Sequence, residues 1–184
     1  MIDKIASGKY KNHRLKTLFG NHTRPTLSRL RKSLCDIIMH SDELPPLENS
    51  ICADIFAGSG AVGIALLSHG AQKMYFCEPD KYAFDILQEN TRHIDNAIIH
   101  QQSAFDININ KKCDIIFIDP PYDFYDDDVW LEQLCVRWCH DQSYIILQAP
   151  KNYQPSLSYP SLLMRREYGN HIFIFLKYQT PYQS

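Results

Sequence analysis

The chain has 184 residues, 45% of them hydrophobic and 22% charged, and its net charge is −2. This length suits one globular domain with a hydrophobic core. No apolar run approaches the roughly 20 residues that span a bilayer, and the opening MIDKIASGKYKNHRLK lacks the apolar centre of a signal peptide. We therefore expect a cytoplasmic protein without membrane segments. We also expect a monomer.

The N-terminal segment concentrates positive charge. Residues 1–32 contain nine Lys and Arg residues and one acid, Asp3, whereas the other 152 residues contain ten basic and twenty acidic residues. A basic arm on an acidic body indicates contact with a polyanion such as nucleic acid. A solvated tail is the alternative interpretation.

The arm also carries structural signals. Gly8 and Asn12 can turn a short hairpin. Thr26 is a candidate N-cap for a helix whose apolar face repeats at helical spacing, with Leu27, Leu30, Leu34, Ile37 and Ile38. The loop-like SDELPPLENS (41–50) separates this region, residues 1–40, from a body of residues 51–184.

The body alternates strands and helices. Apolar runs predict strands at 51–57, 73–78, 97–101, 113–119 and 143–149. Amphipathic segments predict helices at about 61–70, 81–93 and 125–140. The dipeptide Gly169-Asn170 predicts a hairpin within 161–178. The fold class is therefore α/β, a mostly parallel sheet covered on both faces, with a C-terminal antiparallel hairpin.

The six cysteines show no CxxC spacing. Without a secretion signal they are not expected to form disulfides. Cys135 and Cys139 would share a helix face, but no second ligand pair accompanies them. We expect all six to pack in the core, and we expect no metal. They are Cys35, Cys52, Cys77, Cys113, Cys135 and Cys139.

A glycine turn follows the first strand of the body. In DIFAGSGAVG, Gly58, Gly60 and Gly63 satisfy G-x-G-x-x-G, and Glu78 ends the next strand. This pattern suits a dinucleotide, with the acid on a ribose hydroxyl. S-adenosylmethionine can use the same geometry. Asp54 favours the latter cofactor, because a carboxylate beneath the turn would repel a pyrophosphate but can receive an ammonium group.

The fourth strand runs into DPPY. Pro120 and Pro121 cannot continue a sheet ladder and stiffen the chain beside Asp119. Asp119 and the Pro120 carbonyl can accept the two N–H bonds of an exocyclic amine on a nucleobase and orient its nitrogen. Tyr122 offers a ring on which the base can stack. The sequence thus predicts methylation of a nucleobase amine.

These motifs, DIFAGSGAVGIALLSHGA, IIFIDPPY, ASGKYKNHRLKT with TRPT, and RREYGN, resemble the bacterial 16S rRNA guanine-N2 methyltransferases over nearly the whole chain. The resemblance implies a class I (Rossmann-like) methyltransferase fold with an N-terminal hairpin and helix. It implies 16S rRNA, within the assembling or assembled small ribosomal subunit, as the partner.

The motifs and the resemblance together assign roles to specific residues. Catalysis is expected at Asp119, Pro120, Pro121 and Tyr122. The cofactor, S-adenosyl-L-methionine, is expected at Asp54, Phe56, Gly58, Ser59, Gly60, Glu78, Ser103 and Ala104. The RNA is expected at Lys9, Lys11, Arg14, Arg24, Thr26 and Arg29.

Three positions depart from the family pattern. Ala65 and Gln148 stand where the family commonly has acids, and Ser103 stands where it usually has Asp. Three alternatives remain open: DPPY also suits adenine, the glycine pattern also suits a dinucleotide, and Ala65 and Ser103 leave room for a protein without activity. They are an adenine-N6 methyltransferase acting on another RNA or DNA, a nicotinamide-dependent oxidoreductase, and a non-catalytic rRNA assembly factor on the same fold.

Overall fold

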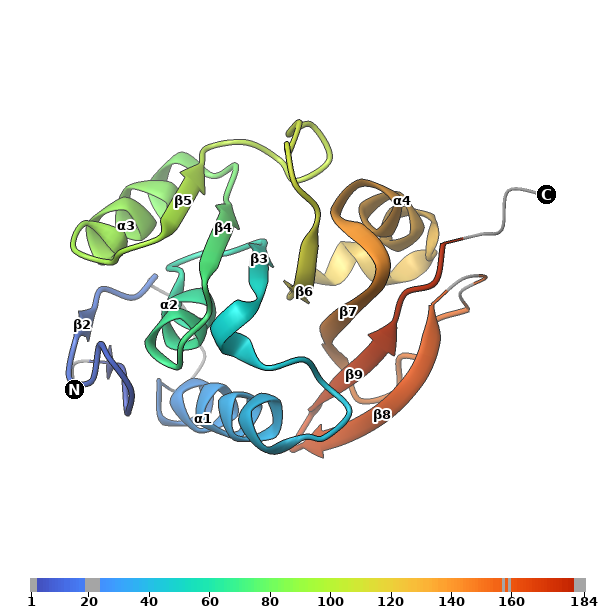
Figure 1. Ribbon diagram of the computed structural model, residues 1–184, viewed down its shortest axis with the longest axis horizontal. Coiled ribbons are helices and arrows are strands. Elements are labelled where there is room, and N and C mark those ends of the chain that lie inside the picture. The colour runs from blue at the N-terminus through green and yellow to red at the C-terminus, as the bar shows by residue number, and fades with distance from the viewer. Residues whose placement is uncertain (1–2, 19–23, 157, 159, 181–184) are drawn as a thin grey trace.

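The computed structural model (Figure 1) describes residues 3–18, 24–156, 158 and 160–180. For Arg24–Leu27, Tyr122 and Asp126 it describes the backbone alone. In this part of the chain, no helix has both the length and the apolar character needed to cross a membrane.

A seven-stranded sheet forms the centre of the molecule. Its strands are β3 (Ile51–Ile55), β4 (Lys73–Cys77), β5 (Ala97–His100), β6 (Cys113–Ile118), β7 (Cys139–Pro150), β8 (Ser161–Tyr168) and β9 (His171–Lys177). They lie in the order β5-β4-β3-β6-β7-β9-β8. The first five are parallel, and β9 runs antiparallel to both β7 and β8. The predicted α/β sheet with a C-terminal hairpin is confirmed.

Helices cover both faces of this sheet (Figure 1). They are α1 (Arg24–His40), α2 (Ala61–Ser68), α3 (Lys81–Thr91) and α4 (Val129–Trp138), with short 3₁₀ turns η1 (Leu47–Asn49) and η2 (Tyr122–Asp126). Neighbouring residues of β3 point to opposite sides, as strand geometry requires. Cys52 packs in the cluster that contains α1 and α2 residues, whereas Ala53 packs in the cluster of α4.

The predicted N-terminal hairpin is present and packs against the end of α2. Its strands are β1 (Asp3–Lys4) and β2 (Arg14–Leu15), and both Gly8 and Asn12 have positive φ angles. The Lys9 amide donates to the Ser68 carbonyl at 2.7 Å, and the Ser68 hydroxyl donates to the Ser7 carbonyl at 2.6 Å. The hairpin thus satisfies a carbonyl that the end of α2 would otherwise leave without a partner.

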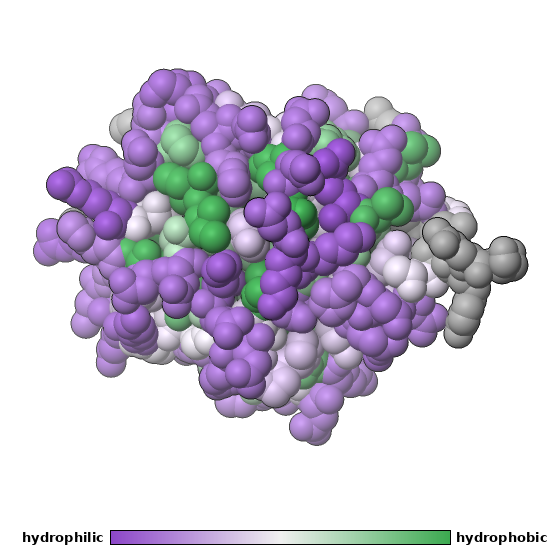
Figure 2. All heavy atoms as spheres, turned by 45° about the horizontal axis from the view of Figure 1, so that its top comes forward, coloured by the Kyte–Doolittle hydropathy of each residue, from purple (hydrophilic) through white to green (hydrophobic). Residues whose placement is uncertain are grey.

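The hairpin and α1 share a core with the body. Ile5, Leu15 and Leu34 are buried in the same cluster as Leu66 and Phe76. All six cysteines are also buried, as expected, and their thiols are free. Figure 2 shows one face of the molecule, which is mostly hydrophilic, with hydrophobic residues reaching the surface in patches near its middle.

Three predicted boundaries are wrong. Helix α1 begins at Arg24, so Thr26 lies inside the helix and is not its N-cap; Pro25 fits the first turn, where no N–H is required. The predicted helix 125–140 is η2 followed by α4, which begins at Val129. Strand β7 begins at Cys139, four residues early, because Cys139 pairs with Cys113 before the register shifts.

We predict that Gly8→Ala destabilises the protein more than Gly169→Ala. Both glycines have positive φ, but a Cβ on Gly8 would lie 2.0 Å from the Ser68 carbonyl oxygen, whereas one on Gly169 meets nothing within 4 Å. The excess loss in free energy of unfolding should be about 1–3 kcal/mol, measured by urea denaturation. Equal losses would show that the hairpin tolerates a side chain here.

Candidate functional site

Three acidic residues meet where neighbouring parallel strands end. Asp54 lies within β3, Glu78 follows β4, and Asp119 follows β6. The strands β4 and β6 pair with opposite edges of β3, so the strand order reverses at β3. A crevice at the carboxyl ends of the strands is the usual ligand site of such a sheet.

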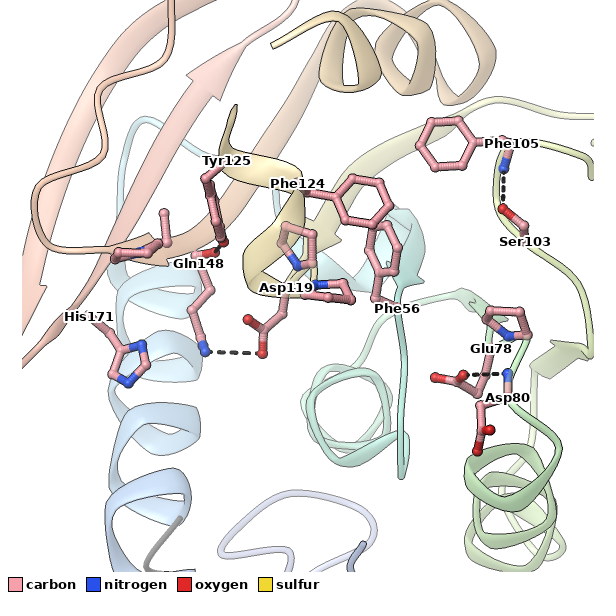
Figure 3. A pocket seen from close by; sticks show the side chains of 15 residues that line it. Phe56, Glu78, Asp80, Ser103, Phe105, Asp119, Phe124, Tyr125, Gln148 and His171 are labelled. Atoms are coloured by element: carbon pink, nitrogen blue, oxygen red, sulfur yellow. Dashed lines mark hydrogen bonds between the residues drawn. The ribbon is translucent and has the colours of Figure 1, made fainter. Parts of the chain in front are cut away.

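A cavity of about 600 Å³ occupies this crevice. Figure 3 shows Asp119 and Glu78 on opposite sides of it, with Phe56 and Phe124 between them. The rings of Phe56 and Phe124 meet edge to face with centroids 5.1 Å apart, and Phe105 stacks on Phe124 at 6.2 Å. The cavity therefore has an aromatic wall and an acid at either side, which suits a flat, polar-edged ring system.

A second cavity, of about 330 Å³, adjoins the first. Phe56, Asp119 and Gln148 line both. The second cavity is also lined by Asp54 and Ser59 from the body and by residues of the N-terminal region, namely Asp3, Thr17, Leu18, Leu30, Arg31 and Leu34. A ligand could therefore extend from one cavity into the other past Asp119.

The glycine turn is built around Glu78. Phe56, Gly58 and Gly60 all have positive φ, and Gly60 is the N-cap of α2. One Glu78 oxygen accepts the Gly58 N–H, and the other accepts the Asp80 N–H, both at 2.8 Å. These bonds fix the carboxylate, while the remaining lone pairs can accept hydrogen bonds from a ligand.

Asp54 is buried beneath the turn, with 2% of its surface exposed. Its carboxylate accepts the Gly63 N–H at 2.9 Å. Burial raises the pKa of Asp54 to about 8, and the charges of Asp119 and Glu78 act in the same direction. A positively charged ligand group would reverse this effect and favour the ionised form. Gly63 has no room for a side chain, since a Cβ would lie 2.3 Å from the Phe76 ring.

Asp119 lines both cavities. One of its oxygens accepts a hydrogen bond from the Gln148 amide at 3.0 Å (Figure 3). The protein packed around the carboxylate raises its pKa to about 7, and the Gln148 bond acts in the opposite direction. The side chain is still accessible to water from the cavity, which moderates this shift.

The prolines after Asp119 also line the larger cavity. The Pro121 carbonyl accepts the Phe124 N–H at 3.1 Å, whereas the Pro120 carbonyl has no donor among the described residues. The Pro120 carbonyl is thus free to accept a hydrogen bond from a ligand. The predicted stacking role of Tyr122 concerns a side chain outside the described residues.

Ser103 and Ala104 differ in their placement. Ser103 lines the larger cavity, and its hydroxyl accepts the Phe105 N–H at 3.3 Å (Figure 3). Ala104 is buried, does not line either cavity, and presents its carbonyl to the Trp138 indole at 3.0 Å. Its predicted contact with the cofactor remains a prediction.

The basic residues of the arm divide into paired and unpaired ones. Lys9 pairs with Asp95 at 2.8 Å. Lys11, Arg14 and Arg29 are exposed and form no ion pair with the described residues. The side chains of Arg24 and Thr26 lie outside the description.

Sequence reasoning missed a buried asparagine that ties the arm to the glycine turn. Asn90 is 2% exposed, and its amide donates to the Ser59 carbonyl at 2.8 Å and to the Lys16 carbonyl at 2.9 Å. Its oxygen accepts the Lys16 N–H at 2.8 Å. A polar residue on the buried face of α3 was the available signal. Phe105, Phe124 and Arg31 were missed as well, because nothing local marks them.

No metal site is apparent in the described part of the chain, where no three His, Cys, Asp or Glu side chains are grouped to hold an ion.

Comparisons with known proteins show the family of this chain. Residues 3–177 match the family model described as "Conserved hypothetical protein 95", and the chain belongs to this family. It is 27% identical to ribosomal RNA small subunit methyltransferase D of Haemophilus influenzae, over 96% of this chain and 93% of that protein. The protein of that name from Buchnera aphidicola is 34% identical, over 65% of this chain and 61% of its own length.

The solved structures show the fold. The Escherichia coli protein yhhF superposes with a TM-score of 0.80 at 22% identity, covering 98% of this chain and all of that one. The fold is that of the class I methyltransferases. This is the expected fold.

We predict that Asp54→Asn stabilises the protein increasingly as pH rises. The folded-state pKa of Asp54, about 8, exceeds the value of about 3.9 for an unfolded chain. Its contribution to stability is therefore full below pH 4 and lost as pH rises through 8. Asn keeps an acceptor for Gly63 but cannot ionise. Urea denaturation at pH 5, 7 and 9 should show a gain of at least about 1 kcal/mol at pH 9.

The control is Asp85→Asn, which changes an exposed carboxylate. Its stability difference from wild type should stay nearly constant over the same range. If the Asp54→Asn and wild-type curves ran parallel, Asp54 would not be held in a raised-pKa environment.

Proposed function

We propose that this member of the family transfers a methyl group from S-adenosylmethionine to the exocyclic N2 amine of a guanine in small-subunit ribosomal RNA, in the cytoplasm. One observation carries the proposal. Asp119 and Pro120, whose carbonyl accepts no hydrogen bond from the described residues, line the same cavity as Glu78. One cavity thus holds acceptors suited to an amine and an acid suited to a ribose.

The residues present fit S-adenosylmethionine. Glu78, fixed by two backbone N–H groups, can accept the ribose hydroxyls, and the aromatic wall can pack against the adenine. Asp54 lies beneath the turn in the smaller cavity, where the methionine end would lie. When bound, the cofactor supplies an electrophilic methyl group on a sulfonium.

Asp119 and Pro120 would orient the amine. An exocyclic amine is a poor nucleophile, because its lone pair is delocalised into the ring. Gln148 occupies one oxygen of Asp119, which leaves the other for one N–H of the amine, while the Pro120 carbonyl accepts the second N–H. Two such bonds direct the nitrogen lone pair toward the methyl group, and the carboxylate balances the positive charge that develops on nitrogen.

The choice of ribosomal RNA rests on the relatives and on the arm. Two curated relatives carry the name ribosomal RNA small subunit methyltransferase D. Strand β2 ends beside Thr17 and Leu18, which line the smaller cavity, so exposed Arg14 lies close in sequence to the site.

Asp119 and the Pro120 carbonyl could equally accept the N6 amine of an adenine. Nucleoside mass spectrometry of methylated small subunits distinguishes N2-methylguanosine from N6-methyladenosine.

We predict that Asp119→Ala lowers methyl transfer by about 10²-fold or more, because it removes a contact made chiefly in the transition state. Binding of S-adenosylhomocysteine should change little, since Asp54, Glu78 and the glycine turn remain. The measurements are single-turnover methylation of unmodified small subunits with saturating cofactor, and calorimetry on the same preparations.

Asp123→Ala is the matched control, because it removes an exposed carboxylate from the same segment outside the cavity. Its turnover should equal that of wild type. In the wild type, turnover should rise with pH through about 7 as Asp119 ionises, and Asp119→Asn should flatten this step. Near-normal turnover in Asp119→Ala would refute the role given to Asp119.

We predict that replacing Lys11, Arg14 and Arg29 together by Gln weakens RNA binding and flattens its salt dependence. Each phosphate contact contributes about −0.7 to −0.9 to the slope of log K against log salt, so three contacts change the slope by about 2 to 3. Substitutions are preferable to deletion, because the hairpin and α1 share the core of the body. Binding is measured by filter retention over a range of salt concentrations.

The control removes three exposed cations of the body, Lys111, Lys151 and Arg166, by the same substitution. It matches the change in net charge but leaves the arm intact. Equal slopes of log K against log salt in the two triple variants would assign the salt dependence to overall charge. The arm would then be a solvated surface without RNA contacts.

A further inference from the structure

Two buried side chains of opposite charge line the smaller cavity. Asp54 lies beneath the glycine turn, and Arg31 belongs to α1. Their exposed fractions are 2% and 7%. An amino acid carries an ammonium and a carboxylate on one carbon atom. Asp3 and Asp119 also line this cavity, whereas Arg31 is the one basic residue among the described residues that do. Asp54 and Arg31 therefore offer charge-assisted partners to the two ends of such a zwitterion.

Asp3 holds Arg31 in place. Its two oxygens accept from Nη1 at 3.0 Å and from Nη2 at 2.9 Å, which is a bidentate pair. Nη2 also donates to the Lys4 carbonyl at 3.1 Å and to the Ser28 hydroxyl at 3.2 Å. Held by this pair and by neighbouring groups, the guanidinium has little rotational freedom, so binding an anion would cost little further ordering.

Arg31 keeps donors that these bonds do not use. A guanidinium has five N–H groups. Among the described residues, the Nε–H and the second N–H of Nη1 have no acceptor. A buried cation with unused donors beside a cavity can take a second anion through one of these single N–H groups, since Asp3 accepts from the two Nη atoms alone.

We propose that Arg31 binds the carboxylate of the methionine end of the cofactor, opposite the ammonium that Asp54 receives. The inference rests on the proposed function, since it takes S-adenosylmethionine as the cofactor. It makes α1, a helix of the basic N-terminal region, part of the cofactor site. Arg31 thereby differs from Arg29 and Lys32 of the same helix, which are exposed.

The test pairs a change in the protein with a change in the ligand. S-adenosylhomocysteine and its decarboxylated analogue differ by the carboxylate alone, and calorimetry gives the affinity of each. Wild type should prefer S-adenosylhomocysteine by about 10- to 150-fold, the effect of one hydrogen-bonded charge. Arg31→Met, which keeps an unbranched stem about as long as the aliphatic part of arginine but removes the guanidinium, should bind both ligands with similar affinity.

Two controls separate this role from others. Lys32→Met removes a neighbouring exposed cation and should keep the wild-type preference. Glu78→Gln should lower the affinity for both ligands by the same factor, because Glu78 contacts the ribose, which both ligands share. If Arg31 had only a structural role, Arg31→Met would behave like Glu78→Gln, with both affinities reduced and their ratio unchanged. That result would overturn the proposal.

Arg31→Met leaves Asp3 buried without its partner, which can prevent folding. In that case the ratio is measured in the double variant Asp3→Asn, Arg31→Met, with Asp3→Asn as the reference. Equal affinities of wild type for the two ligands would overturn the proposal without any variant. If wild type bound neither ligand, the proposed function itself would fail, which is a different result.

Discussion

The site depends on the parallel pairing of β3 with β6 at the centre of the sheet. The register places Asp54 beside Phe117 and Ile55 beside Ile118, so the two strands end together and Asp119 follows at once. With β4 on the other flank of β3, Glu78 reaches the same edge. A slip of one residue would turn Asp54 to the opposite face of the sheet. The three carboxylates converge because a hydrophobic core holds this register.

The features that the sequence predicted well are those written in short stretches. An apolar run followed by Pro-Pro predicts a strand end, and glycines that need positive φ predict a turn, so the places of Asp119 after β6 and of Gly58 in the turn were predicted. The Arg31–Asp3 pair and the Asn90 contacts join residues 28 to 74 positions apart. No local pattern encodes such contacts. Boundaries failed where pairing overrode local propensity, as at the start of β7.

The three residues that depart from the family pattern, Ala65, Ser103 and Gln148, lie in different environments. Gln148 donates a hydrogen bond to Asp119, which an ionised Glu at this position could not do. A second acid would instead raise the pKa of Asp119 further. Ser103 keeps a place in the larger cavity, and Ala65 is buried close to the hairpin. The acceptors that we propose for an amine and a ribose therefore stay in place despite these changes, which favours an active enzyme over a non-catalytic assembly factor.

The burial of the six cysteines affects how the arm can be studied. Burial raises the pKa of Cys35 and Cys113 to about 12, so their thiolates are scarce at neutral pH. Thiol reagents attack the thiolate and need access to it. A cysteine introduced at exposed Lys11 would thus react selectively with a photo-crosslinking maleimide. The path of the arm along ribosomal RNA could then be traced in a protein that keeps all of its native thiols.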